Sequence, residues 1–495
     1  MKKILKIIQI FLLVYLYFGG MIFSADWNFM VYMDGDNDLD IATNGDINEM
    51  LSVSDTENVN ILLLVDKSYY SDTHLYRIVN GSKVNLDQYL WDEEVNMGNP
   101  VTLQRFIQFC IENYPATKNA LILWNHGSGW RAPSRACCQD VINSDWLYTS
   151  EIQEGIRIAK EQGVVIDLIG FDACLMGMIE VDYELKDLCD VVVSSEASEP
   201  FWGWPYDTIL NDLVNYSTMT ASDFSKVIVN RYKQRYSGID YETTLSAVDM
   251  KYLDSVITAI NEFSNSMSFF AVNPEWQRIQ KARQSCCAFS EESGYYGIDL
   301  WNFVDKIEQN CLNENVKEKA SNVKAALESF IISNYAGFLV GENTSYNAKG
   351  RAIYFPEDKT DFVESYTDEN KRYPVKFVSD NKWSNFLQRY YNPATGIEKV
   401  TSGPNPFNPQ KGDVVAIAIP ESLKGSQLNI RIYNIAGQLV RTLDEDTTEI
   451  DPQKGGGFWD GRNDEGDLVS SGLYFFVAVS NKGKGRGKIT LKRSN

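Results

Sequence analysis

Nucleophilic catalysis could be carried by one cysteine and one histidine, because each of them follows a short apolar run. Cys174 comes shortly after the apolar run from Ile166 to Phe171. His126 directly follows a second apolar run, ALILWN, which begins at Ala120. The other histidine, His74, begins its apolar segment, which favours a surface position in a strand. A thiol becomes a strong nucleophile when a neighbouring base takes its proton. Cys174 and His126 are therefore the candidate pair for covalent catalysis.

The two apolar runs have the length and composition of strands that are buried on both faces of a parallel sheet. Side chains at the carboxyl ends of such strands meet at one sheet edge, where open α/β sheets bind ligands. Apolar residues from Leu175 to Leu188 have helical spacing, so we expect a helix directly after Cys174. The N-terminus of that helix would lower the pKa of the thiol. The alternative is a buried structural thiol, which is common for cysteine.

Strand-like and helical runs alternate along most of the chain, which predicts an α/β fold with a mostly parallel sheet flanked by helices. Residues 392–402 are rich in proline and glycine and read as a linker. Residues 403–495 alternate short strands with turns at NIAGQ and NDEGD, which predicts a small all-β, immunoglobulin-like sandwich. The expected α/β domain spans residues 26–391, and residues 1–25 precede it.

The segment 1–25 has the features of a secretory signal peptide: it begins MKKILK, continues with an apolar run and ends in small residues. A membrane anchor is the alternative, but the run is short for a span and no positive charge follows it. We therefore expect a bacterial protein that is secreted, periplasmic or on the cell surface, without a stable membrane span. The formal net charge of -21 disfavours nucleic acid as a partner and favours basic peptides, and a solvated acidic surface is the alternative explanation of this charge.

The segment DGDNDLD starts like a calcium-binding EF-hand loop, with Asp34, Asp36 and Asp38 in the first ligand positions. Leu39 stands where that loop requires glycine, and Gly45 stands where it requires a bidentate glutamate. The pattern favours aspartates that cap and charge the N-terminus of the following helix. The sequence leaves calcium binding open, assigns no metal ligand, and indicates no cofactor requirement for the thiol chemistry.

The motifs around the two candidate residues resemble those of the clostripain family of cysteine peptidases. These motifs are NHGSGW from Asn125, DACLMGMIEV from Asp172, YMDGDNDLD, WPYD at Trp204 to Asp207 and GRAIYFP at Gly350 to Pro356. The resemblance runs from about residue 26 to 391 and implies the caspase-like fold shared with gingipains, legumains and caspases. It also implies a cysteine endopeptidase that cuts after Arg or Lys in protein or peptide substrates.

The resemblance also implies roles for individual residues. His126 would take the proton of Cys174, and the backbone N–H groups of Gly127 and Cys174 would stabilise the oxyanion. The family generally works as a dyad, so no third catalytic residue is expected. Asp172 matches the carboxylate at the floor of the family's pocket for a basic side chain, and a strand-end cap is its alternative role.

The loop before Gly203 departs from the family's pattern. Family members commonly carry a second acid there, where this chain has Phe201 and Trp202. A tryptophan face replaces a carboxylate only partly as a partner for a guanidinium group, so the preference for arginine is expected to be relaxed. Self-cleavage after Arg131 or Arg135 is a further expectation, because both arginines lie in a polar, irregular segment that runs to Asp145.

The segment after residue 403 resembles immunoglobulin-like modules related to flagellar hook-capping proteins and type IX secretion tails. It carries IYNIAGQLVRTL, FWDGRNDEGDLVSSGLYFF and KGRGKITLKR. This resemblance implies contact with secretion machinery or attachment to the cell surface. Two other functions compete with that of a peptidase: a non-catalytic surface binding protein with the same fold, and an acyl-transferring ligase that uses the same thiol.

Overall fold

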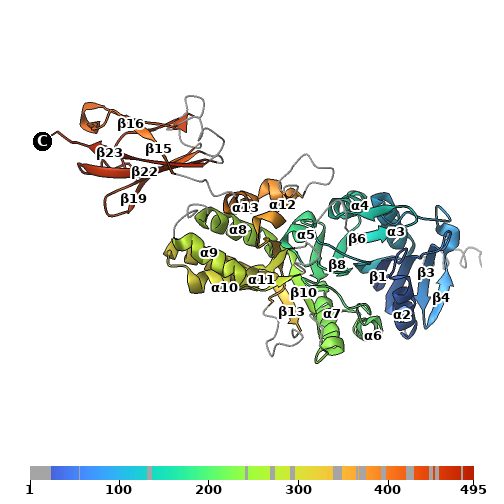
Figure 1. Cartoon of the computed structure of the whole chain (residues 1–495). Helices are drawn as coiled ribbons and strands as arrows, with labels where there is room; N and C mark the ends of the chain where they lie inside the picture. The colour runs from blue at the N-terminus through green and yellow to red at the C-terminus, as the bar shows by residue number, and fades with distance from the viewer. Residues whose placement is uncertain are drawn as a thin grey trace, which may run out of the picture. The chain divides into compact units, whose positions relative to one another are not determined.

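The computed structural model describes most of the chain in two compact units (Figure 1). One unit comprises the described residues within 1–266 and 277–384, and the other those within 267–276 and 385–495. The structure describes residues 24–494 except 55, 131–136, 240–242, 268–273, 290–295, 338–347, 364–365, 367–374, 392–396, 420–427, 445–449, 452–455 and 481–482. The predicted signal peptide therefore lies almost wholly outside the described residues, and its boundary stays a prediction. Within the described residues, no helix is long and apolar enough to cross a membrane.

A nine-stranded mixed sheet forms the centre of the first unit, in the order β13-β10-β9-β8-β5-β1-β2-β3-β4. Its parallel strands are β1 (Ala25–Asp34), β2 (Val59–Asp66), β5 (Ala116–Trp124), β8 (Ile166–Asp172) and β9 (Cys189–Ser194). The antiparallel strands at the two sides are β3 (His74–Val79), β4 (Ser82–Asn85), β10 (Thr244–Asp249) and β13 (Ile331–Ala336). The predicted α/β class is confirmed.

Helices cover both faces of this sheet, as the alternating side chains of β1 demonstrate. Phe29 packs edge-on against Phe224 of α7 on one face. On the other face, Tyr32 contacts Phe106 of α3 and donates a hydrogen bond to the Met97 carbonyl at 2.8 Å. The helices are α2 (Asp40–Leu51), α3 (Pro100–Asn113), α4 (Thr149–Glu161), α5 (Ile179–Glu184), α6 (Tyr206–Asn215), α7 (Ala221–Tyr236), α8 (Leu253–Met267), α9 (Pro274–Gln284), α10 (Leu300–Asn310), α11 (Glu314–Phe330), α12 (Lys376–Asp380) and α13 (Trp383–Tyr391). Such double coverage explains why the parallel strands are almost continuously apolar.

The GRAIYFP segment forms β14 (Ala352–Tyr354) in a separate three-stranded sheet with β11 (Ala288–Phe289) and β12 (Gly297–Asp299). The arginine of this segment, Arg351, is fully buried and donates from Nε to Asp182 Oδ2 at 2.6 Å. Because Asp182 belongs to α5, this buried ion pair joins β14 to the helix that follows Cys174.

The polar segment that ends at Asp145 is more regular than the sequence predicts. Its residues from Cys137 onward form a two-stranded antiparallel sheet of β6 (Cys137–Asp140) and β7 (Asp145–Leu147). Cys137 and Asp140 are buried, so the irregular, exposed loop predicted here is wrong from Cys137 onward. Arg131 and Arg135, the predicted self-cleavage positions, lie outside the described residues.

The second unit contains the predicted carboxyl-terminal strands, arranged in two sheets of order β15-β23-β22-β18-β19 and β16-β17-β21-β20. These strands are β15 (Ile397–Lys399), β16 (Thr401–Gly403), β17 (Val415–Ala418), β18 (Asn429–Tyr433), β19 (Leu439–Leu443), β20 (Ile450–Asp451), β21 (Gly456–Trp459), β22 (Gly472–Ser480) and β23 (Gly483–Leu491). Ile417, Ile430, Trp459 and Phe476 are among the residues of their shared, fully buried core. An all-β carboxyl-terminal part is therefore confirmed.

Candidate active site

His126 and Cys174 follow neighbouring parallel strands, as the sequence predicts. Strands β5 and β8 pair with Trp124 opposite Asp172, and both candidate residues come directly after that point. The two connections touch, because a Cβ atom added at Gly127 would lie 2.2 Å from the carbonyl oxygen of Cys174. The imidazole and the thiol therefore belong to the same edge of the sheet.

Cys174 lies in a tight turn and not at the start of a helix. Helix α5 begins at Ile179, so the predicted helix from Leu175 to Leu188 is wrong at both ends. Leu175 adopts a φ of 64° and donates from its N–H to the Ala197 carbonyl at 3.0 Å. This turn is tied to the segment after β9, and no helix N-terminus adjoins the thiol.

The surroundings of Cys174 favour the neutral thiol. Burial, helped by the charges of Glu199 and Asp172, raises the pKa of Cys174 to about 11, and the hydrogen bond that the Glu199 N–H donates to Sγ at 3.2 Å opposes this rise. The expectation that a helix dipole lowers the pKa of this thiol is therefore wrong. A base has to remove the proton when the thiol reacts.

His126 has a carboxylate partner that the dyad expectation did not include. Its Nε2 lies 2.6 Å from Asp38 Oδ1, and this contact holds the pKa of Asp38 below its usual value. Asp38 is largely exposed, and the imidazole is 40% exposed. In the described part of the chain, no hydrogen bond joins His126 to Cys174, and Nδ1 of His126 has no partner. The ring is thus held through one nitrogen, and its other nitrogen is left without a bond.

The predicted capping of helix α2 by the DGDNDLD aspartates is wrong. The N-cap residue is Leu39, which has no side-chain cap, and its N–H is bonded by the Asn37 side chain at 2.9 Å. Asp38 contacts His126, while Asp36 Oδ2 accepts a hydrogen bond from the Ile142 N–H. These aspartates join the helix start to the neighbouring loops.

Two backbone N–H groups near the thiol make no described hydrogen bond to another residue. These are the N–H groups of Gly127 and Cys174, and the second acts only on its own Sγ, where it lowers the pKa of the thiol. Both residues are only partly buried. An oxygen atom that arrives between these two N–H groups could accept a hydrogen bond from each.

Asp172 is buried at the end of β8, with 4% of its surface exposed. Its Oδ2 accepts from the Trp204 N–H at 3.1 Å and from the Tyr206 hydroxyl at 2.9 Å. Burial raises the pKa of Asp172 to about 7, and these two hydrogen bonds oppose that rise. Gly203 is required beside it, because its φ is 47° and an added Cβ would lie 2.8 Å from the Asp172 carboxylate. Asp172 therefore fixes the aromatic loop while its Oδ1 has no partner among the described residues.

Asp172 acts electrostatically on two further buried carboxylates, those of Asp46 and Glu199. Burial raises the pKa of Asp46 to about 9, and the charge of Asp172 adds to the rise. The Trp124 indole donates to Asp46 at 2.7 Å. Burial also raises the pKa of Glu199, whose Oε2 accepts from the Tyr232 hydroxyl at 2.6 Å. We name Asp46, Asp172 and Glu199 the acidic group.

Trp202 and Arg235 lie close to this acidic group. The Trp202 ring is half exposed, and the Cβ position of Gly45, the residue before Asp46, lies 3.4 Å from it. Arg235 is paired with Glu49 at 2.6 Å, and its charge lowers the pKa of both Asp46 and Asp172. The charge of Arg235 thus offsets the negative charge of the acidic group only in part.

Comparison with known proteins decides the family. The profile of the clostripain family matches residues 31–390, which is most of the chain and includes both candidate residues. The chain belongs to the clostripain family. It is similar to clostripain of Hathewaya histolytica, with 28% identity over 452 residues, which cover 76% of this chain and 81% of that protein. This clostripain-family protein is accordingly a cysteine peptidase.

Solved clostripain-family structures share its fold. A secreted C11 cysteine protease from Bacteroides thetaiotaomicron, solved with an irreversible peptide inhibitor, superposes with a TM-score of 0.55 at 20% identity. That match covers 73% of this chain and all of the other. An inactive zymogen C11 protease from Parabacteroides distasonis gives a TM-score of 0.53 at 19% identity and covers 74% of this chain and 98% of the other.

Sequence reasoning missed Asp38, Asp46 and Glu199 as site residues of this clostripain-family protein. The position of Asp38 within a family motif could have indicated a site residue, but helix capping explained that position equally well. Glu199 could also have been found, because it precedes the aromatic loop that forms part of the site. Asp46 carried no such signal, because it is one of several acids within a helix and only the tertiary structure brings it to Asp172.

A neutral resting thiol predicts the pH dependence of alkylation. The rate of Cys174 modification by iodoacetamide should rise about tenfold for each pH unit between pH 6 and 9, because the thiolate fraction rises in this way below a pKa of about 11. Mass spectrometry of the peptide that contains Cys174 gives the rate for this residue alone. A rate that is already constant from pH 6 would instead indicate a resting thiolate paired with imidazolium.

Proposed function

We propose that this chain is a secreted endopeptidase that hydrolyses peptide bonds through His126 and Cys174. His126 takes the thiol proton as the sulfur attacks the carbonyl carbon, and the Gly127 and Cys174 N–H groups bind the resulting oxyanion. The imidazolium then gives its proton to the leaving amine, and an acyl-enzyme remains. Water, deprotonated by the same imidazole, releases the acid and restores the thiol. The neutral thiol and the two N–H groups without a bond to another residue support this sequence of steps.

Asp38 acts in this proposal as a positioning residue for His126. Its carboxylate accepts from Nε2, which selects the tautomer whose Nδ1 is a free acceptor for a proton. It also stabilises the imidazolium that forms during the reaction. Because Asp38 is largely exposed, its contribution is expected to be smaller than that of a buried aspartate.

We propose further that the enzyme prefers Arg or Lys on the amino side of the cut. The observation that carries this proposal is the acidic group, three carboxylates whose burial and mutual repulsion leave them short of positive charge. Asp172 Oδ1 has no hydrogen-bond partner among the described residues, and the Glu199 carboxylate is approached by the Tyr232 hydroxyl and the Trp204 indole but by no cation. A guanidinium or ammonium group would supply both charge and donors. Glu199 and Asp46 thus supply the acidity that Phe201 and Trp202 lack, with the Trp202 face beside them.

Substitution of Asp172 tests this preference. We expect Asp172→Asn to lower kcat/KM for a peptide with arginine at the cleavage site about 100-fold, since a buried partner charge is removed. The matched peptide with norleucine should lose less than about fivefold. Asp190→Asn, which changes an exposed aspartate of β9, serves as the control. Equal losses on both peptides would assign Asp172 to loop structure alone.

The same two peptides test the charge of Asp172 through pH. As pH falls through about 7, Asp172 gains a proton, so the ratio of kcat/KM for arginine over norleucine should decrease. This decrease should be absent in Asp172→Asn.

Mass analysis of the products with an added amine separates hydrolysis from acyl transfer to that amine. Absence of any peptide turnover would instead support a non-catalytic binding function.

We also propose that the carboxyl-terminal strands serve export or surface attachment and take no part in catalysis. They have a buried core of their own, and the candidate catalytic residues all lie in the first unit. Their resemblance to immunoglobulin-like secretion modules and the expected signal peptide support this role. Secreted relatives within the clostripain family agree with it.

A further inference from the structure

Two adjacent cysteines at the start of β6, Cys137 and Cys138, hold their thiols against each other inside the fold. Both residues are fully buried, and their sulfur atoms lie 3.4 Å apart. Neighbouring side chains of a regular strand point to opposite faces, which keeps their ends apart. Contact between the two thiols therefore requires a departure from regular strand geometry.

A bulge at Cys138 provides this departure. In the pairing of β6 with β7, Cys137 lies opposite Leu147 and Gln139 lies opposite Trp146, so Cys138 is the extra residue. Its φ is 56°, in the left-handed region where bulges commonly have glycine. A residue with a side chain is costly there, and such conformations concentrate where the side chain has a function. The bulge brings the second thiol of the pair to the first.

Two free thiols would gain little from this arrangement. A thiol is a weak donor and a weak acceptor, so one contact between S–H and S adds little stability. A disulfide needs a distance of about 2 Å between the sulfur atoms, and each atom would move by less than about 1 Å to reach it from the observed 3.4 Å. The geometry is thus close to that of a bonded pair.

We propose that Cys137 and Cys138 form a vicinal disulfide when the chain is in an oxidising medium. One thiolate attacks an external disulfide and releases one thiol, and the second sulfur then attacks the mixed disulfide and releases the other. The external disulfide gains two electrons and two protons, which the cysteine pair loses. Because both sulfur atoms are buried, this exchange takes place while β6 is open, during folding or local unfolding. The inference rests on the proposed export only for the place where the oxidant is met.

The bond is expected to be reversible. Adjacent Cα atoms are about 3.8 Å apart across a trans peptide, closer than in ordinary disulfides, and this deviation makes a disulfide easier to reduce. The folded backbone lessens the disadvantage, because it already holds the two sulfur atoms in contact. The folded chain should therefore favour the disulfide more than the unfolded chain does. By linkage, the disulfide should stabilise the folded chain to the same extent.

The cysteine pair lies next to a backbone group that contacts the surroundings of His126. The carbonyl of Gln139, the residue after the pair, accepts hydrogen bonds from Asn37 Nδ2 at 2.9 Å and from Asn125 Nδ2 at 3.5 Å. Asn37 directly precedes Asp38, and Asn125 directly precedes His126. A closed disulfide ring would restrict the bulge and hold this carbonyl in place.

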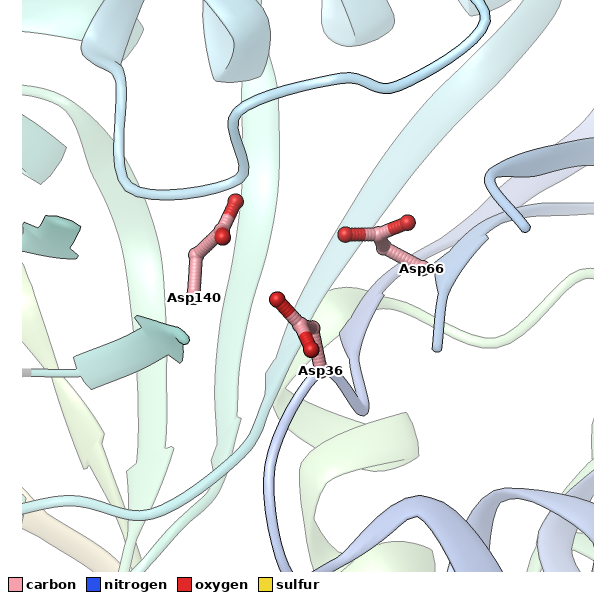
Figure 2. A group of neighbouring side chains, drawn as sticks. All are labelled: Asp36, Asp66 and Asp140. Carbon is pink, nitrogen blue, oxygen red and sulfur yellow. The ribbon is translucent and has the colours of Figure 1, made fainter. Parts of the chain in front are cut away.

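The end of β6 is joined to the turn after β1 as well. Figure 2 shows the side chain of Asp140 pointing toward those of Asp36 and Asp66. All three residues are buried, and one carboxylate oxygen of each lies within 4.8 Å of the others. We name these residues the aspartate triad. Movement of β6 would therefore reach the turn that carries Asp38, the partner of His126.

Mass analysis of the Cys174→Ala chain tests the bond. This chain lacks the catalytic thiol, so neither self-cleavage nor exchange at Cys174 interferes. The chain is equilibrated with mixtures of reduced and oxidised glutathione, quenched with acid, denatured, treated with N-ethylmaleimide and digested with trypsin. The tryptic peptide 136–157 contains both cysteines and no other. In oxidising mixtures it should carry no N-ethylmaleimide and weigh two hydrogen atoms less than the reduced peptide.

The same mixtures with a denaturing concentration of urea measure what the fold contributes. The equilibrium between thiols and disulfide should favour the disulfide at least ~10-fold more in the folded chain, a difference of ~1.4 kcal/mol. The oxidised chain should accordingly unfold at least ~2 °C higher than the reduced chain. Cys138→Ser should lose this difference. Cys286→Ser, a change in the other adjacent cysteine pair, should retain it.

Three results would overturn the proposal. The first is full modification of peptide 136–157 by N-ethylmaleimide in the most oxidising mixture. The second is a cross-link from Cys137 or Cys138 to a third cysteine. The third is equal oxidation with and without urea, which would show that the bulge does not favour the bond. All three are measured on the parent chain, so they do not depend on the folding of a variant. No peptide substrate is used, so the outcome is independent of the proposed cleavage.

Discussion

Cys174→Ala should abolish peptide cleavage, and His126→Ala should reduce it by a comparable factor, on the order of 10⁴ or more in kcat/KM. Alanine at position 174 leaves no atom to form the acyl-enzyme. The His126 variant retains a thiol whose pKa is about 11, so almost none of it is ionised near neutral pH and nothing nearby removes its proton. The two losses should be of similar size because the residues act in one step.

The measurement is hydrolysis of an arginine peptide by purified variants whose thermal unfolding matches that of the wild type. His74→Ala is the matched histidine control, since His74 begins β3 and its ring contacts Asp72 at 3.3 Å and Asp87 at 2.9 Å. Cys286→Ala is the cysteine control. Activity within about tenfold of wild type in either His126→Ala or Cys174→Ala would overturn the dyad.

Gly127→Ala should lower kcat by about 10³-fold with little change in KM. The added Cβ would lie 2.2 Å from the Cys174 carbonyl oxygen and 3.1 Å from the Ala173 side chain, and both atoms belong to the turn that carries the nucleophile. Either the loop after β5 or the turn after β8 has to move. The imidazole and the thiol therefore separate, and the N–H of residue 127 points in another direction. A displacement of about 1 Å can cost on the order of 10²-fold, and loss of an oxyanion donor about 10²- to 10³-fold.

Gly472→Ala provides the control for this substitution, because an added Cβ there meets only Tyr474, at the ordinary contact distance of 3.8 Å. Steady-state kinetics on an arginine peptide separate kcat from KM, and thermal unfolding reports any general loss of structure. A Gly127→Ala enzyme with kcat within about threefold of wild type would show that the connections accommodate a methyl group and that the proposed oxyanion site is misplaced.

The strands that carry the site could be predicted from sequence, because their apolar runs have a direct physical cause. The observed bounds of β5 and β8 differ from the predicted ones by only a few residues, since both faces of each strand are covered. The helix predicted after Cys174 failed for a related reason. Leu175 and Met176 are buried by tertiary contacts of a turn, and helical spacing alone does not distinguish that burial from one face of a helix.

The sequence alone could not predict the clusters of side chains that come from distant segments of the chain. The acidic group combines a helix residue, a strand end and a loop residue, and the aspartate triad combines three chain segments. Strand β6 was missed because CCQD resembles a polar loop, although Cys137 and Asp140 are buried in the fold. Spacing along the chain predicts residues on one element well, but it carries little information on which elements will bring their carboxylates together.

The neutral state of Cys174 also bears on how long the enzyme survives in an oxidising medium. A thiolate attacks peroxides and disulfides far faster than a thiol does. With a pKa of about 11, only on the order of one Cys174 in 10⁴ is ionised at pH 7. The sulfur would thus meet an oxidising medium in its inert form and acquire full reactivity only for the moment when a bound peptide is attacked. Chemical durability between turnovers follows from the same burial that makes the histidine indispensable.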